Sequence, residues 1–536
     1  MINKINNIIL WFLIIFAIYC AFFIGLTWDT FFHIDIGSNR LRYLLSLGAY
    51  DYISYADQKF YPGIFDTLSV FITKMFPKNY EIETLNLTRL TFSISAIFGI
   101  SKIASELFNK QVGKIVFLLC FFNPTFFGHM PINQKDIIIA FSNIWATYLI
   151  IKYLKNQTLN EKRNSYSILL GLVIGFGLGV RIAFFGTLIP VVLISIVEIF
   201  FLKQIVSKNF SNKKLVIDII KVIIISYFLM ILCWPETHEN IFILPFTLLI
   251  DSFKDIRGVA AGLSAGNFYL SAETPKLYLL TNLFYKLPEF ILFTYFIFIY
   301  LIFKKRFFFE EKFKSFSIKL ILILSILTFP QILILVSPYK IIDGLRLFLY
   351  VIPYICIIPA LVIYYLISNF KIYTYKIFLT SIFILFTYYL FIFFSLTPYQ
   401  YTYLNIFNGD FSKSHKKFEN DYWAVSINEL VNQIPNNKDL LNNNELKLAF
   451  CGASDDNVKF YLEKIKNFKF KQVNWINEDY DYIIMTNRVI LTDIALKKTS
   501  EEKINNLETC FDRFKGKDVI TVKRNGLTLS TLRKKN

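Results

Sequence analysis

The chain has 536 residues, 55% of them hydrophobic, and a mean hydropathy of +0.48. These values exclude an ordinary soluble enzyme and are typical of a polytopic membrane protein. The formal net charge of +18 would suggest a nucleic-acid partner, but most Lys and Arg residues lie in short loops between apolar segments, so we expect membrane lipids and no nucleic acid as partners.

The first apolar segment, Ile8–Gly25, is long enough to cross a bilayer and lacks a small-residue cleavage site, so we expect it to stay as an anchor. It is followed by "LTWDTFFHIDIGSNRL", which places acidic residues where bilayer edges usually carry aromatic or basic anchors. On a helix, Asp29 and His33 would share one face. A carboxylate there could accept a proton from a hydroxyl group, although polar residues simply exposed at the interface are an alternative.

The segment Tyr61–Pro77 is apolar at helical spacing but contains Asp66 and Lys74 and lies between prolines. If it crossed the membrane, the later loops rich in Lys and Arg would change sides. We therefore expect an amphipathic helix that lies on or dips into the outer face, within a first extracytoplasmic loop at residues 28–89.

Apolar runs of sufficient length predict about eleven transmembrane helices. They are Ile8–Gly25, Leu90–Leu107, Ile115–Phe127, Ile137–Ile151, Tyr166–Val180, Phe184–Phe201, Leu215–Cys233, Phe290–Phe303, Leu320–Val336, Leu347–Ile367 and Ile377–Leu396.

The basic loops then place the N-terminus in the cytoplasm and the C-terminal tail outside, in a multi-pass protein of the inner (plasma) membrane. We divide the chain into a transmembrane domain, 1–396, and an extracytoplasmic domain, 397–536. A large extracytoplasmic loop covers 234–288.

A second acidic loop, "NPTFFGHMPINQKDIII", begins at Asn123. Asp136 would lie in the first turn of a helix, where the helix dipole favours an anion, so a structural role is an alternative to a catalytic one. That alternative does not account for His129 and Lys135 in the same loop, which we take as candidate substrate-binding residues.

Two arginines stand at the outer ends of apolar segments, Arg181 in "GLGVRIAFFG" and Arg346 in "IIDGLRLFLY". The planar guanidinium suits a phosphate, whereas extension of the side chain to the interface is the alternative for either one alone. Their occurrence on the same side as the carboxylates favours substrate binding.

The stretch "CWPETHEN" contains Glu236 and His238, which could ligate a divalent metal ion and, in the case of His238, contact substrate. Its spacing fits no strong metal signature, so a polar loop without a metal is the alternative. The sequence also lacks a Walker-type phosphate loop, a nucleophile elbow and an H-E-x-x-H zinc motif.

The tail has the pattern of a small α/β domain. Strands are expected at "LKLAFCG" and "YDYIIMTN", a helix at "DDNVKFYLEKI", and a hairpin around the Asn-Gly of "DVITVKRNGLTLSTL". Cys451 and Cys510 could pair there in an oxidising compartment, whereas the other four cysteines belong to apolar segments.

These motifs resemble the GT-C superfamily of membrane glycosyltransferases, in particular bacterial relatives of the dolichyl-phosphate-mannose–protein mannosyltransferases. The resemblance is carried by "WDTFFH", "SLGAYDY", "KFYPGIFDTL", "NPTFFGHMPINQKDIIIAF", "DGLRLFLYVIP", "TPYQYTYLNIFNG" and "FENDYWAVSINEL", over residues 28–430. The family pattern is altered at Thr30, where relatives usually have Glu, and at Leu347, where they often have His.

The resemblance implies a GT-C-like fold and transfer of a sugar from a polyprenyl-phosphate donor to a hydroxyl acceptor outside the cytoplasm. We expect an inverting displacement with Asp29 as general base and Asp136 as the second catalytic carboxylate. Arg346, Arg181 or Lys135 would stabilise the departing polyprenyl phosphate.

Two other functions are compatible with an apolar chain of this kind. A transporter or flippase of lipid-linked saccharides would carry charges in the middle of its spans, whereas here they lie at span ends. A polysaccharide polymerase or ligase also has a large outer loop but would not be expected to carry this acidic pair.

Overall fold

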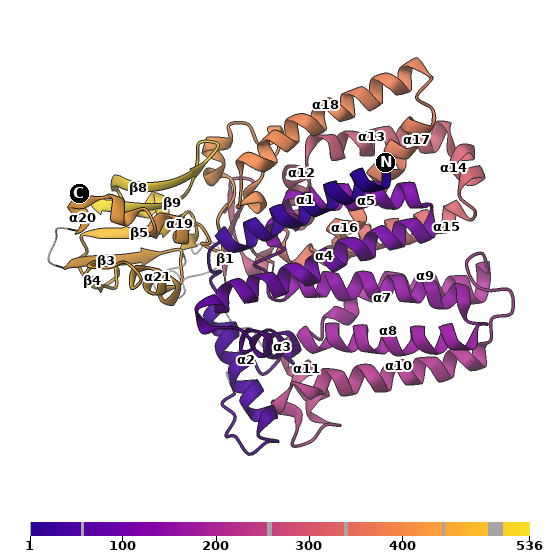
Figure 1. The fold of residues 1–536 in the computed structure, drawn as a ribbon, viewed down its shortest axis with the longest axis horizontal. Coiled ribbons are helices and arrows are strands. Elements are labelled where there is room, and N and C mark those ends of the chain that lie inside the picture. The colour runs from indigo at the N-terminus through magenta and orange to yellow at the C-terminus, as the bar shows by residue number, and fades with distance from the viewer. Residues whose placement is uncertain (1, 55–57, 255–259, 337–340, 442–444, 491–506) are drawn as a thin grey trace.

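The computed structural model describes residues 2–54, 58–254, 260–336, 341–441, 445–490 and 507–536. Apolar helices form a bundle, and the C-terminal sheet domain stands against one end of it (Figure 1). We call this end the domain end. The short helices α2 (Thr30–Leu45), α3 (Ile64–Thr73) and α11 (Leu244–Lys254) gather at the same end.

Long runs of Ile, Leu and Phe without interior breakers form most helices of the bundle, and polar caps such as Asn109 and Ser211 begin two of them. The helices are α1 (Ile2–Phe23), α4 (Glu81–Leu107), α5 (Lys110–Phe121), α7 (Asp136–Asn156), α8 (Asn160–Val180), α9 (Phe184–Val197), α10 (Asn212–Leu232), α13 (Glu289–Lys304), α15 (Phe316–Val336), α17 (Ile357–Ser368) and α18 (Tyr373–Ser395).

Shorter elements connect these helices. They are α6 (Pro124–His129), α12 (Tyr278–Lys286), α14 (Arg306–Lys312), α16 (Ile352–Ile355) and a hairpin of β1 (Ala261–Ser264) and β2 (Asn267–Leu270). The hairpin lies in the loop 234–288, where the sequence pattern predicted no strand.

Within the described residues, seven helices are long and apolar enough to cross a membrane, or eight if α12 and α13, bent by 112°, form one span. The chain is therefore a polytopic helical membrane protein, with fewer long spans than the eleven expected. Ile115–Phe127 is divided between α5 and α6 because Asn123 caps a new helix that starts at Pro124. Asn7–Phe23 and Ile352–Ser368 are apolar but shorter.

The segment Tyr61–Pro77 forms a helix of ten residues, α3, rather than a span. Most of its side chains are buried against the protein, and others in the segment, such as Phe71 and Met75, are exposed. α3 contacts α2, α4 and α8, and Asp66 is buried among them with an exposed fraction of 3%. Asp66, the polar residue that argued against a span, therefore makes its contacts inside the protein.

The C-terminal domain contains a five-stranded mixed sheet in the order β4-β3-β5-β9-β8. Its strands are β3 (Leu446–Cys451), β4 (Phe470–Gln472), β5 (Tyr482–Thr486), β8 (Gly516–Arg524) and β9 (Leu527–Lys535), with a second pair formed by β6 (Val489–Ile490) and β7 (Glu508–Thr509). The helices are α19 (Ile427–Val431), α20 (Lys438–Leu441), α21 (Asp455–Leu462) and α24 (Cys510–Arg513).

The predicted hairpin is confirmed: β8 and β9 are antiparallel, and Asn525 and Gly526 both have positive φ, as a tight Asn-Gly turn requires. Cys451 and Cys510 form a disulfide with a Cα–Cα distance of 6.0 Å. The other four cysteines are buried, as expected.

Apolar packing attaches this domain to the bundle. Ile24 and Ile132 belong to the same buried cluster as Val425 and Leu527. A Cβ atom at Gly25 would lie 2.2 Å from the carbonyl oxygen of Val425, so only glycine permits this approach. The segment that follows α1 is thus fixed against the domain at Gly25, shortly before Asp29.

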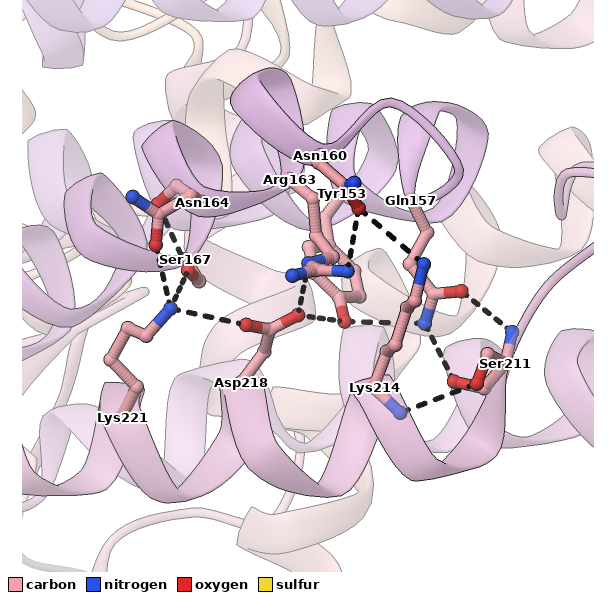
Figure 2. Close-up of polar contacts among 10 residues, drawn as sticks. All are labelled: Tyr153, Gln157, Asn160, Arg163, Asn164, Ser167, Ser211, Lys214, Asp218 and Lys221. Carbon is pink, nitrogen blue, oxygen red and sulfur yellow. Dashed lines mark hydrogen bonds and ion pairs between the residues drawn. The ribbon is translucent and has the colours of Figure 1, made fainter.

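At the opposite end of the bundle, a polar network joins α7, α8 and α10 (Figure 2). The buried Asp218 carboxylate lies 3.2 Å from Arg163 Nε and 3.3 Å from Lys221 Nζ, and it accepts a hydrogen bond of 2.9 Å from Tyr153. Gln157 donates to the carbonyl of Ser211, which fixes the start of α10. The network therefore fastens three helix ends together.

Candidate functional site

A cavity of about 560 Å³ opens at the domain end of the bundle. Its lining combines titratable groups with an apolar part made by residues such as Ile182, Leu249 and Leu347. The titratable groups include six of the residues singled out from the sequence: Asp29, His33, Lys135, Asp136, Arg181 and Arg346.

Asp29 immediately precedes α2, in the position where an aspartate usually accepts a hydrogen bond from the helix backbone. Its side chain makes no such capping bond. Within the described residues the carboxylate has neither a hydrogen bond nor an ion pair, and it is only partly buried. Asp29 therefore presents to the cavity a carboxylate that makes no hydrogen bond or ion pair with the described residues.

Asp136 has the opposite surroundings. Its carboxylate lies 3.4 Å from Arg181 Nη1 and 3.5 Å from Arg346 Nε. Asn133 caps the start of α7 by accepting a hydrogen bond of 2.7 Å from the Asp136 amide. Asp136 thus lies between two arginines at the cavity wall, and its place in the first turn of α7 also suits the helix dipole.

Arg346 begins a short 3₁₀ helix after a tight turn. The turn has two successive residues with positive φ, Asp343 (+62°) and Gly344 (+64°), a conformation that Asp and Gly tolerate. It directs the Asp343 carboxylate to Arg346 Nη1 at 2.8 Å. Burial disfavours the charged form of Arg346, but Asp343 and Asp136 hold the pKa of Arg346 above its ordinary value, so the guanidinium stays charged.

Lys135 is held over the Tyr61 ring, with Nζ 4.0 Å from the ring centroid, and Arg181 lies 5.5 Å from the same centroid. Burial lowers the pKa of Lys135, and Arg181 adds to this effect. The Arg181 charge also lowers the pKa of the Tyr61 hydroxyl, against the effect of burial. These directions indicate a region of concentrated positive charge, suited to an anion.

His33 lines the cavity beside Asp29 and has its Nδ1 atom 3.2 Å from Asp66 Oδ1. Asp66 also accepts a hydrogen bond of 3.0 Å from Gln134. Burial would raise the pKa of Asp66, but the charges of His33, Lys135 and Arg40 keep it below its ordinary value. The carboxylate thus fixes the imidazole ring, as carboxylates do for ring nitrogens in many sites.

His129 lies behind the cavity wall rather than in it. It is fully buried, and its Nε2 atom shares a hydrogen bond of 2.7 Å with the Tyr422 hydroxyl. Burial and the charge of Arg346 lower the pKa of His129 to about 3, so the ring is neutral. It packs against Trp423, which lines the cavity and lies under the guanidinium of Arg346.

Glu236 and His238 lie outside the cavity lining. Glu236 accepts a hydrogen bond of 2.9 Å from Tyr52 and lies 3.7 Å from Arg40. His238 contacts the Tyr43 hydroxyl and the carbonyl of Ile231 through its two ring nitrogens. Among the described residues, no group of three or more His, Cys, Asp or Glu side chains could hold a metal ion.

Sequence reasoning missed several residues that shape the cavity. The sequence marks Asp66 only as a polar residue that argues against a span, and Trp423 only as part of a stretch that resembles the family. Arg40, on α2, donates to the carbonyls of Gln58 and Tyr61 and so fastens the loop that carries these two cavity residues to α2. The sequence did contain a signal for Asp66, because an acidic residue on an apolar helix is unusual. No local pattern marked Trp423 or Arg40 as residues that shape the cavity.

Neither a family model nor a curated protein matches this sequence. Two crystal structures of ArnT from Cupriavidus metallidurans, one in the apo state and one bound to undecaprenyl phosphate, match it with a TM-score of 0.50 and 11% identity. Each match covers 99% of this chain and 98% of that chain. A structure of the Archaeoglobus fulgidus oligosaccharyltransferase matches with a TM-score of 0.42 and 13% identity, over 86% of this chain and 65% of that one.

Proposed function

We propose that this chain, which has the fold of GT-C membrane glycosyltransferases, transfers a sugar from a polyprenyl-phosphate donor to a hydroxyl acceptor. The observation that carries the proposal is a cavity in which an unpaired carboxylate, Asp29, shares the lining with three cationic side chains. The binding of undecaprenyl phosphate by the Cupriavidus ArnT supports a lipid-phosphate ligand for this fold.

The cationic part of the cavity would hold the donor phosphate. Arg181, Arg346 and Lys135 supply charge-assisted hydrogen-bond donors, and Asp136 fixes the two arginines. The apolar part of the lining, with Ile182 and Leu347, suits the first isoprenoid units of the lipid. As the bond between the sugar and the phosphate breaks, negative charge grows on the leaving oxygen, and these cations would stabilise it.

Asp29 would act as general base. It removes the proton from the acceptor hydroxyl, whose oxygen forms a bond to the anomeric carbon while the bond from that carbon to the phosphate oxygen breaks. One displacement of this kind inverts the anomeric configuration and releases polyprenyl phosphate. His33, with its Nδ1 atom engaged by Asp66, would offer Nε2 to orient the acceptor.

We place this reaction on the extracytoplasmic face. The three loops richest in Lys and Arg follow α7, α9 and α13, and they lie at the end of the bundle opposite the sheet domain (Figure 1). Basic loops stay in the cytoplasm, and a structural disulfide needs an oxidising compartment, so both observations support an outer domain end. A lipid-carried donor is then required, because nucleotide sugars are cytoplasmic.

The test incubates purified protein in detergent with a panel of polyprenyl-phosphate sugars and a panel of glycan, lipid and peptide acceptors, with nucleotide sugars as control donors. We expect release of polyprenyl phosphate with at least one lipid donor and none with nucleotide sugars. NMR of the product should show the anomeric configuration inverted. Transfer from a nucleotide sugar alone, or retention of configuration, would overturn the proposal.

A further inference from the structure

A row of alternating charges leads from the cavity into the C-terminal domain. Its order is Arg181, Asp136, Arg346, Asp343 and Arg488. The last link is an ion pair of 3.2 Å between Arg488 Nη1 and Asp343 Oδ1. Asp343 has an exposed fraction of only 3%, so its charge is shared between two guanidinium groups with little help from solvent.

Arg488 is held in place from both sides along the chain. Asn487 donates to the carbonyl of Phe418 at 3.0 Å, and the amide of Val489 donates to Glu419 at 2.9 Å. The Arg488 side chain itself donates to the carbonyl of Tyr422, next to the cavity residue Trp423. The segment that carries Arg488 is thus joined to the segment that forms one wall of the cavity.

The disulfide supports the same backbone. The amide of Cys510 donates a hydrogen bond of 2.9 Å to the carbonyl of Arg488. A Cβ atom on Gly452, which follows Cys451, would lie 3.0 Å from Arg488 Cβ and 3.1 Å from Cys510 Sγ. The Arg488 guanidinium lies 5.3 Å from the centre of the Trp28 ring. Trp28 directly precedes Asp29 in the sequence. One arginine of the C-terminal domain therefore contacts both Asp343 and Trp28, the neighbour of the cavity residue Asp29.

We propose that Arg488 is a positioning residue through which the C-terminal domain completes the phosphate-binding part of the cavity. This inference rests on the proposed function. The row contains three arginines and two aspartates, so these five side chains together carry a net charge of +1, which favours an anionic ligand. Without Arg488 the row becomes neutral, and Asp343 attracts Arg346 alone, away from the ligand.

The test measures binding of undecaprenyl phosphate to the full-length protein in detergent, with the uncharged alcohol undecaprenol as a second probe. We expect Arg488→Met to weaken binding of undecaprenyl phosphate by roughly five- to tenfold, because Asp343 is almost fully buried and a charge pair there is screened less by solvent than an exposed one. Binding of undecaprenol should be unchanged. Arg488→Lys, which keeps the charge, should restore affinity to within about threefold of the original protein.

Arg524→Met is the matched control. Arg524 also belongs to the C-terminal domain and also makes a close ion pair, 2.6 Å to Glu429, but it lies outside the cavity and the charge row. We expect its loss to leave both probes bound as before. Arg488→Gln, which keeps a donor for the Tyr422 carbonyl, serves as a second neutral variant if the methionine variant folds poorly.

Neutral variants that bind undecaprenyl phosphate as tightly as the original protein would overturn the proposal. Equal loss of both probes in Arg488→Gln, or equal loss in Arg524→Met, would also overturn it, because the effect would then be a general one of domain docking. Failure of the original protein to bind undecaprenyl phosphate at all would instead overturn the proposed function, so the two failures are distinguishable.

Discussion

Asp29 and Asp136 are both aspartates at the edge of apolar helices, yet their surroundings give them different chemistry. Asp136 lies between Arg181 and Arg346, so its negative charge is paired with two positive charges of the protein. Asp29 lines the same cavity without a capping bond. A base needs an accessible lone pair, so the proposed mechanism assigns proton transfer to Asp29 and the positioning of cations to Asp136.

This difference predicts the effect of Asp29→Asn. The amide cannot accept the acceptor proton, so kcat should fall by about 10²–10⁴-fold. The KM for the donor should not rise, because the substitution removes a negative charge near the phosphate-binding cations. Both constants are measured from the release of polyprenyl phosphate.

Asp35→Asn is the control for this substitution, since Asp35 lies on α2, the helix that Asp29 precedes, but is exposed and outside the cavity lining. It should leave kcat within about twofold, because a surface substitution away from a site has little effect. Activity retained in Asp29→Asn would exclude Asp29 as the base.

At the scale of elements, two polar assemblies stand at opposite ends of the bundle. At the domain end, α2 and α3 are joined through His33 and Asp66, which orders the cavity wall. At the other end, Asp218 joins α8 and α10 through Arg163 and its own neighbour Lys221 (Figure 2). The first assembly adjoins the proposed site, whereas the second lies at the far end of the bundle, so we expect the second to act on stability alone.

Asp218→Asn should therefore reduce stability without changing ligand binding. The amide keeps one acceptor for Tyr153 but leaves the Arg163 guanidinium without its counter-charge, which we expect to cost about 1–3 kcal/mol. Thermal unfolding in detergent measures the loss, and the affinity for undecaprenyl phosphate should match that of the original protein. A changed affinity with unchanged stability would contradict a purely structural role.

At the scale of the whole molecule, the C-terminal domain contributes to the wall of the cavity. Trp423 lines the cavity, and apolar packing fixes the end of α1 against Val425. This arrangement predicts that the domain and the cavity share one side of the membrane, away from the basic loops.

A reporter fusion tests that orientation. Alkaline phosphatase, which needs disulfides to be active, should be active when fused after Asn536 and inactive when fused in the loop 203–211. Fluorescent protein fusions, which fold in the cytoplasm, should give the opposite pattern at the two positions. Phosphatase activity in the loop alone would reverse the orientation and remove the argument for a lipid-carried donor.

Much of this molecule follows from local sequence. Hydropathy determines the apolar helices because each needs only its own run of side chains, and the Asn-Gly pair determines the β8–β9 turn through its backbone conformation. The positions of acidic and basic residues near helix ends were likewise visible as candidates. These features depend on neighbours a few residues apart.

The tertiary structure alone decided which of these charges meet. Asp66 and His33 come from different helices, and Arg488 reaches Asp343 across 145 positions of sequence. The tertiary structure also places three candidate residues outside the cavity lining, where each contacts a tyrosine hydroxyl: His129, Glu236 and His238. Ion pairs between distant segments depend on how helices and domains pack. A pattern of neighbouring residues in the sequence does not indicate which distant residues will meet.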